Sequence, residues 1–207
     1  MQIIYDKDSV FQYSYLAERD YSKLNNSFLS NTLKALDFLY KNDVLTVYYS
    51  KDFKVDIIDA LVDDADEEIR IIQGPSNKYY PATNTIQFKD THGVEFRKNF
   101  RKRFSGSNIG YNSPVALLSH ELIHCYHELF DENGYKKRRQ DHTTKGHKLL
   151  PTGVDLSFPN REEALVVRLT NQVAKRLGED KRGNYGRNYY PTKDVLSTEK
   201  LDENEVV

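Results

Sequence analysis

The sequence predicts an α+β fold, in which three amphipathic helices surround a small, strand-rich middle region. Apolar residues recur at helical spacing over residues 22–42, and two further helical stretches lie in the second half of the chain. Between residues 44 and 89 the pattern changes to short runs rich in β-branched and aromatic residues. This change of pattern indicates one small sheet with helices packed against it.

Length and charge restrict the possible classes of protein. The 207 residues suit one domain over residues 1–207, and we expect residues 1–20 and 193–207 to be flexible. Thirty basic and 31 acidic residues give a net charge of -1, which excludes a global field that attracts nucleic acid or anionic lipid. The single cysteine, Cys125, excludes an internal disulfide and a multi-cysteine zinc site. A metal site would therefore need histidine and carboxylate ligands.

Membrane and export signals are not apparent in the sequence. No apolar run approaches the roughly 18 residues that a membrane helix requires. Residues 1–6 also lack the basic start and apolar stretch of a secretory signal. We therefore expect no membrane partner and no export by the general secretory route.

The elements of the first half follow from their periodicity. Residues 22–42 carry leucine and aromatic side chains on one face, which predicts a helix that covers the core. Strands are expected at residues 44–49, 54–58, 69–73 and 85–89, because each run is rich in strand-forming residues and ends in turn residues.

The second half contains two helices with recognisable start signals. Ser113 as N-cap and Pro114 at the first helical position predict a helix that stops at the Asn-Gly pair of residues 133–134. Residues 135–159 are rich in Lys, Thr, Gly and Pro, which favours a long connection. A second helix is expected over residues 160–177, with an asparagine as its N-cap.

The strongest chemical signal is HELIH at residues 120–124, on the first of these helices. His120 and His124 project from one helical face one turn apart, so both imidazoles can bind a single zinc ion. Glu121 can place a carboxylate beside the open position of the metal. The motif therefore predicts a zinc site, and the alternative is a helix that merely carries two surface histidines.

Zinc needs a third protein ligand, and the chain offers two neighbouring candidates. Phe130 stands where the metzincin pattern needs a histidine, so a downstream carboxylate is expected instead. Glu162 and Glu163 begin the next helix, although Asn160 and Glu163 also have the spacing of a capping box. The apolar stripe of this helix centres nearer Glu162. The residues alone therefore leave the third ligand open between Glu162 and Glu163.

These motifs, together with Arg-x-x-Tyr at residues 182–185, resemble the NleD-like effector zinc metallopeptidases of bacteria. They are more distantly similar to clostridial neurotoxin light chains, and the resemblance covers about residues 84–186. It implies a zincin-like, gluzincin-type metalloprotease fold with a small mixed sheet. It also implies that Glu163 is the third zinc ligand and that Glu162 lies beside the site. Val166 departs from the small hydroxyl residue that the family has three positions after this ligand.

The resemblance also implies the roles of the catalytic residues. Glu121 would take a proton from a zinc-activated water molecule and pass it to the leaving amine. Arg182 and Tyr185 would stabilise the negative charge that develops on the carbonyl oxygen. Arg187 and Tyr190 repeat the same spacing and are the alternative pair.

Substrate and location are likewise expectations from the resemblance. Residues 84–89 resemble the edge strand of this fold, to which a substrate peptide could add as a further strand. The family implies a protein substrate, such as a host signalling protein, and delivery into the host cytoplasm by a type III-like route. Without such delivery, the bacterial cytoplasm is the expected location.

Two other functions stay open at this stage. The basic runs at residues 97–104 and 136–139 could dock a protein or nucleic acid in a module without catalysis. A regulatory bacterial HExxH protease is the other alternative. His127 is expected beside the metal site or on the surface, because three histidines on one straight helix cannot easily surround one ion. Cys125 is expected to be a small buried apolar residue, and His142 and His147 to lie in loops.

Overall fold

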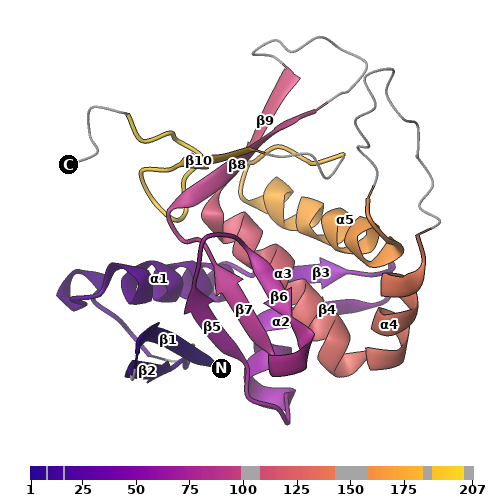
Figure 1. Cartoon of the computed structure of the whole chain (residues 1–207), viewed down its shortest axis with the longest axis horizontal. Helices are drawn as coiled ribbons and strands as arrows, with labels where there is room; N and C mark the ends of the chain where they lie inside the picture. The colour runs from indigo at the N-terminus through magenta and orange to yellow at the C-terminus, as the bar shows by residue number, and fades with distance from the viewer. Residues whose placement is uncertain (8, 16, 99–107, 143–157, 184–187, 203–207) are drawn as a thin grey trace.

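The computed structural model describes residues 1–7, 9–15, 17–98, 108–142, 158–183 and 188–202. It confirms an α+β fold with mixed sheet pairing (Figure 1). None of the helices in this described part is long and apolar enough to cross a lipid bilayer.

The largest sheet has five strands in the order β2-β1-β5-β7-β6. The strands β1, β5 and β7 run parallel, while β2 and β6 pair antiparallel at the two edges. Their bounds are β1 Gln2–Asp6, β2 Ser9–Gln12, β5 Arg70–Gln73, β6 Lys78–Tyr80 and β7 Thr85–Phe88. Ile3 of β1 and Ile71 of β5 are buried between more exposed neighbours, and both belong to the core on the face of the sheet that meets the helices.

The edge of this sheet differs from the sequence expectation. Residues 84–89 were predicted to form the edge strand, but β7 lies between β5 and β6 and pairs with both. The edge is β6, in which Tyr79 pairs with Ile86 of β7. With three residues, β6 is too short to show an alternating pattern, so the sequence does not reveal it.

The described residues also form two smaller sheets, so the expectation of a single sheet is wrong. One has the order β10-β8-β9 and the other is the pair β3-β4. Their bounds are β3 Thr46–Tyr48, β4 Lys54–Asp56, β8 His92–Arg97, β9 Ile109–Asn112 and β10 Asn188–Pro191.

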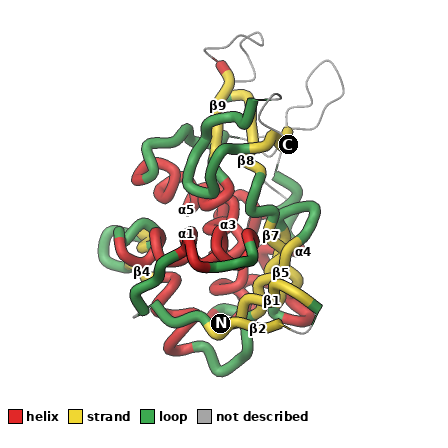
Figure 2. Tube along the Cα trace, turned by 90° about the vertical axis from the view of Figure 1, so that its left-hand side faces the viewer, coloured by secondary structure: helices red, strands yellow, loops and turns green. Residues whose placement is uncertain are grey.

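Helices α1, α3 and α5 lie together on one side of the main sheet. Figure 2 shows α1, α3 and α5 grouped beside the strands of the main sheet, with β8 and β9 beyond them. Their apolar faces form one core with the sheet, including Leu36, Ile71, Ile86 and Leu122. The bounds are α1 Ser27–Lys41, α2 Ile57–Asp59, α3 Pro114–Phe130, α4 Glu132–Gln140 and α5 Arg161–Arg176, with single turns at Tyr21–Lys23, Ala60–Asp64 and Pro81–Thr83.

Helix α4 was not expected from the sequence. A helix stop was predicted at residues 133–134, with a long connection after it, but residues 132–140 are helical. Asp131 is the N-cap of a new helix and accepts a hydrogen bond from the backbone of Gly134. A Cβ atom on Gly134 would lie 2.1 Å from an Asp131 carboxylate oxygen, so glycine leaves room for this capping side chain. The Asn-Gly pair therefore lies in the first turn of α4.

Described residues near both ends of the chain pack against the core. Met1 and Ile3 are buried in the core through β1. Near the other end, Val195 is buried and its carbonyl accepts a hydrogen bond from the backbone N–H of Val115 at the start of α3. The flexibility expected for residues 1–20 and 193–207 stays a prediction, and residues 8, 16 and 203–207 of these segments lie outside the described residues.

A partly buried carboxylate joins the end of α5 to the start of α3. Gly178, at a positive φ of 75°, turns the chain after α5. Glu179 then accepts hydrogen bonds from the backbone N–H of Ser113 at 3.0 Å and from the Asn112 amide at 3.2 Å. It also accepts one from the Ser113 hydroxyl. Burial raises the pKa of Glu179 to about 7, against these hydrogen bonds.

This raised pKa predicts a specific dependence of stability on pH. Between the usual pKa of 4.5 and about 7, the unfolded chain releases a proton that folded Glu179 retains. The contribution of Glu179 to the free energy of unfolding therefore falls, by about 1 to 3 kcal/mol, as pH rises through this window. In urea unfolding at pH 5 and pH 8, the stability advantage of the wild type over Glu179→Gln should shrink at the higher pH.

Glu199→Gln is the matched control, because Glu199 is exposed. Its stability difference from the wild type should stay constant between the two pH values. An equal change in both variants would contradict the role assigned to Glu179.

Candidate metal centre

Helix α3 places the HELIH residues in the interior. Ser113 accepts a hydrogen bond from the backbone of Ala116 and Pro114 occupies the first turn, as the sequence predicts. The helix is buried along most of its length because it packs against the sheet on one side and α5 on the other. His120 and His124 are 2% and 4% exposed, so the alternative of two surface histidines is wrong.

Helix α5 brings both glutamates to this face of α3. Asn160 caps the helix by accepting a hydrogen bond from the backbone N–H of Glu163. The Glu163 side chain does not complete a capping box, since it turns to the histidines instead. Glu162 is fully buried and Glu163 is 6% exposed.

Three ligand-type atoms meet between the two helices. The Nε2 atom of His120, the Nε2 atom of His124 and the Oε2 atom of Glu163 are each 3.2 Å from the other two. The structure thus selects Glu163, the choice implied by the resemblance, as the carboxylate beside both imidazoles.

This triangle suits a metal ion better than hydrogen bonds alone. An ionised carboxylate only accepts, so both imidazoles would have to aim N–H groups at one oxygen while lying 3.2 Å apart. Ligand atoms about 2.0 to 2.2 Å from a tetrahedral zinc-sized ion would lie about 3.3 Å from one another. Among the described residues, His120, His124 and Glu163 therefore form a buried group that could hold a metal ion.

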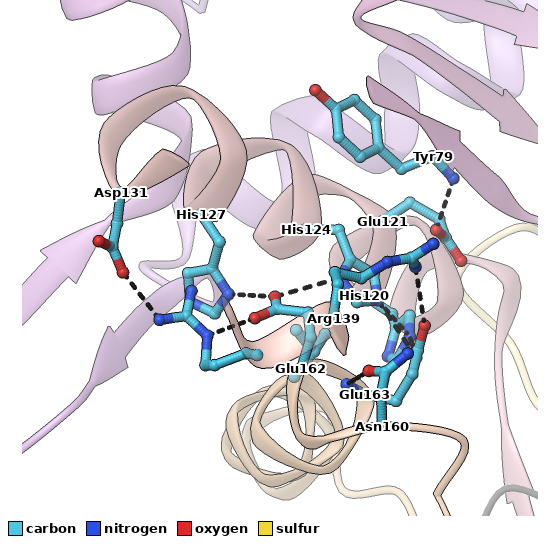
Figure 3. A network of polar contacts seen from close by, with 12 residues as sticks. Tyr79, His120, Glu121, His124, His127, Asp131, Arg139, Asn160, Glu162 and Glu163 are labelled. Carbon is cyan, nitrogen blue, oxygen red and sulfur yellow. Dashed lines mark hydrogen bonds and ion pairs between the residues drawn. The ribbon is translucent and has the colours of Figure 1, made fainter. Parts of the chain in front are cut away.

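Glu162 lies between His124 and His127, on the side of His124 away from the three ligand-type atoms (Figure 3). Its Oε1 atom accepts hydrogen bonds from Nδ1 of His124, at 3.3 Å, and from Nδ1 of His127. Donation through Nδ1 leaves the Nε2 lone pair of neutral His124 directed at the centre, the arrangement that orients metal-binding histidines. Glu162 thus lies where an orienting residue would, and the apolar stripe of α5 did not indicate which carboxylate meets both imidazoles.

Contacts around the centre continue into α4 and into the turn that follows β3. Arg138 of α4 donates to the second oxygen of Glu162 and also pairs with Asp131. On the other side, the Tyr49 hydroxyl donates to Nε2 of His127 at 2.7 Å. His127 therefore lies beside the centre, as expected, whereas nothing in the sequence pattern identifies Arg138 or Tyr49 as contributors.

The electrostatics of the group favour a cation. Burial lowers the pKa of His120 and of His127, so both tend to be neutral. Burial opposes the charge of the carboxylates too, but hydrogen bonds from the histidines outweigh it and hold the pKa values of Glu162 and Glu163 well below their usual range. Burial also opposes protonation of His124, yet its bonds to both glutamates raise its pKa. In the metal-free chain the two carboxylates thus face one protonated imidazole and the Arg138 guanidinium, and a bound metal ion would replace the proton of His124.

A cavity of about 300 Å³ opens onto the three ligand-type residues. Its wall includes β6 and the turn before it, Tyr135 and Arg139 of α4, and Tyr189 of β10. Glu121 also lines this cavity, and its Oε2 atom accepts a hydrogen bond from the backbone N–H of Tyr79 in β6 at 2.8 Å. The glutamate of the motif therefore faces the same space as the candidate metal ligands.

The expected Arg-x-x-Tyr pair is only partly described. Arg182 is buried, but it does not line this cavity, and its guanidinium lies over Phe96. Tyr185 and Arg187 lie outside the described residues. Tyr190 of the alternative pair donates its hydroxyl to the carbonyl of Thr198 and also lies outside the cavity lining. Tyr189, its neighbour, lines the cavity.

The remaining expectations concern basic runs and single residues. Residues 136–139 lie on α4, where Arg138 and Lys136 pair with carboxylates, and 99–104 of the other run lie outside the described residues. Cys125 is fully buried in the core, as expected. His142 contacts the carbonyl of Pro159, and His147 is not among the described residues.

Comparison with known proteins found no family model, no curated protein and no solved structure that matches this chain. The geometry of the centre is therefore the main observation on which a functional proposal can rest.

Variants of the adjacent residues Glu162 and Glu163 test which carboxylate binds the metal. We expect about one divalent metal ion per chain in the wild type, because the three ligand-type atoms lie at suitable separations. Glu163→Gln should lose the metal, since it removes a ligand. Glu162→Gln should retain it with roughly 10- to 100-fold weaker affinity, since it loosens the orientation of His124. Elemental analysis and chelator competition measure both effects.

Thermal unfolding and circular dichroism establish that each variant is folded before the metal is counted. Loss of the metal from Glu162→Gln but not from Glu163→Gln would reverse the ligand assignment. Equal metal content and equal affinity in all three proteins would contradict a role of either glutamate in metal binding.

Proposed function

We propose that this chain is a zinc-dependent metallopeptidase with a zincin-like fold. The observation that carries the proposal is the buried group of His120, His124 and Glu163, which faces a cavity together with Glu121. Two imidazoles and one carboxylate are the protein ligands of many catalytic zinc sites, which keep a further position open for water or substrate. The resemblance in the HELIH and EE motifs supports the same class of chemistry.

The chain's own residues would carry the proton transfers. Bound zinc would lower the pKa of a water molecule towards neutrality and polarise the scissile carbonyl group. Glu121 would accept the proton of the attacking water and deliver it to the leaving amine nitrogen. Because the Tyr79 N–H engages Oε2 of Glu121, we assign the proton to Oε1.

The edge strand β6 offers a place for an extended substrate. It forms the border of the main sheet, and the backbone N–H of Tyr79 points to the cavity and not to β7. A peptide that adds to this edge through backbone hydrogen bonds would pass across the three candidate ligands. The role that the sequence analysis gave to residues 84–89 is therefore proposed for β6.

The groups that stabilise the oxyanion stay a proposal from the resemblance, which names Arg182 and Tyr185. Arg139 and Tyr189 have the same chemistry, a guanidinium and a phenol, and both line the cavity. Variants of the two pairs would distinguish these assignments.

The wider biology is also proposed from the resemblance. A protein substrate, such as a host signalling protein met after type III-like delivery, fits an effector protease of this kind. The docking alternative has less support, because the described basic run of α4 is largely used in ion pairs within the chain. No feature of the described residues favours a regulatory protease over an effector.

Hydrolysis is tested with Glu121→Gln, which keeps the size of the side chain but removes the base. Zinc-loaded wild type, incubated with bacterial and eukaryotic cell lysates, should create new protein N-termini that amine labelling and mass spectrometry detect. The variant should retain zinc, because Glu121 is not a proposed ligand, and should cleave roughly 10² to 10⁴ times more slowly.

Glu18→Gln, at an exposed position outside the cavity, is the control and should cleave like the wild type. Equal cleavage by wild type and Glu121→Gln would contradict the mechanism. An absence of new N-termini with stoichiometric zinc in the wild type would favour a zinc protein without peptidase activity.

A further inference from the structure

A second cavity lies on the side of α5 that faces away from α3. It has a volume of about 540 Å³ and is lined by Arg168, Asn171, Gln172, Lys175, Arg176 and Lys181. Four of these six residues are cations with exposed side chains. Glu162 and Glu163 project from the opposite face of the same helix, so this cavity is separate from the candidate metal centre.

The positive charge of this cavity is not balanced by acids in its wall. None of the described residues that line it has a carboxylate. The acids nearest to Lys181 along the chain are turned elsewhere: Glu179 bonds to Ser113, and Asp180 pairs with Lys98. Four cations close together repel one another, and a bound anion would relieve this repulsion.

Two lining residues, Asn171 and Gln172, are held in place by hydrogen bonds from their side chains to backbone groups. The Gln172 side chain bonds to both the N–H and the carbonyl group of Tyr48 in β3, each at 2.9 Å. Asn171 makes the same pair of contacts with the backbone of Arg182, at 2.7 and 2.8 Å, and so holds the neighbouring Lys181 against α5. The cations thus project from a fixed surface.

Arg176, another lining residue, is also held in place. Its guanidinium donates to the carbonyl of Val44 at 3.0 Å and lies over the ring of Tyr48. Guanidinium groups bind phosphate oxygens through paired N–H donors, and lysine ammonium groups add point charges beside them. Two arginines and two lysines therefore match a ligand that carries several phosphate groups.

We propose that this cavity binds a small, soluble molecule with two or more phosphate groups. The volume lies within the range of small-ligand sites, roughly 300 to 1,000 Å³. From Arg168 to Arg176 the helix rises only about 12 Å, which suits a compact polyphosphate better than the long backbone of a nucleic acid. The net charge of -1 also gives no general attraction for polyanions. This proposal is independent of the peptidase proposal.

Isothermal titration calorimetry of the full chain tests the proposal, with inositol 1,4,5-trisphosphate and inorganic tripolyphosphate as probes. The titrations use protein as purified and protein stripped of metal, since phosphates also bind metal ions. We expect a dissociation constant below about 100 μM at 0.1 M salt, rising with ionic strength. Arg168→Gln with Lys175→Gln should weaken binding by roughly tenfold or more, because two of four charge-assisted contacts are lost.

The control removes the same charge from exposed positions outside the cavity, as Lys7→Gln with Lys51→Gln. It should bind like the wild type, and equal weakening in both pairs would overturn the site. The proposal would also be overturned if neither probe bound at concentrations up to about 1 mM. Binding only to phosphoinositide vesicles or only to single-stranded RNA would reject a soluble small ligand in favour of a membrane or nucleic-acid surface.

Discussion

The packing of α5 across α3 is the contact on which the candidate centre depends. It brings two ionised carboxylates and three imidazoles together in a space from which water is largely excluded. Charged groups lose their hydration in such a place, and they are tolerated only when each one has a partner. Here each carboxylate is hydrogen-bonded to two histidines, so the site has the composition of a metal centre before any ion is considered.

Two adjacent residues of α5 contact different partners, because neighbouring positions on a helix are rotated by about 100°. Glu163 faces the two imidazoles that meet at the centre, while Glu162 faces His127 and the guanidinium of Arg138. Helix α4 is therefore part of the site's support. Its arginine balances the charge that orients His124, and its Tyr135 and Arg139 form one wall of the cavity.

The sequence predicts best those features whose signals are local. The bounds of α3 follow from Ser113, Pro114 and the apolar period, and the HELIH motif identifies the first two candidate ligands. The start of α5 follows from Asn160 in the same way. The choice between the two glutamates could not be made from periodicity, because it depends on which carboxylate meets residues about 40 positions away.

Other features depend on tertiary contacts that leave no local pattern. The strand β6 exists through its pairing with β7, and its three residues have no distinctive alternation. The first turn of helix α4 contains an Asn-Gly pair, which usually indicates a turn, and the Asp131 cap stabilises the helix there instead. Arg138 and Tyr49 join the network only because the chain folds back on α3.

Helix α5 is attached to α3 at both ends. At its start the two glutamates engage the histidines, and just beyond its end Glu179 holds the first residues of α3. A single residue inserted between these attachments would rotate one end by about 100° relative to the other and shift it by about 1.5 Å. The sixteen residues of α5 therefore act as a spacer of defined length, and homologous chains that keep both attachments should vary the composition of this helix but not its length.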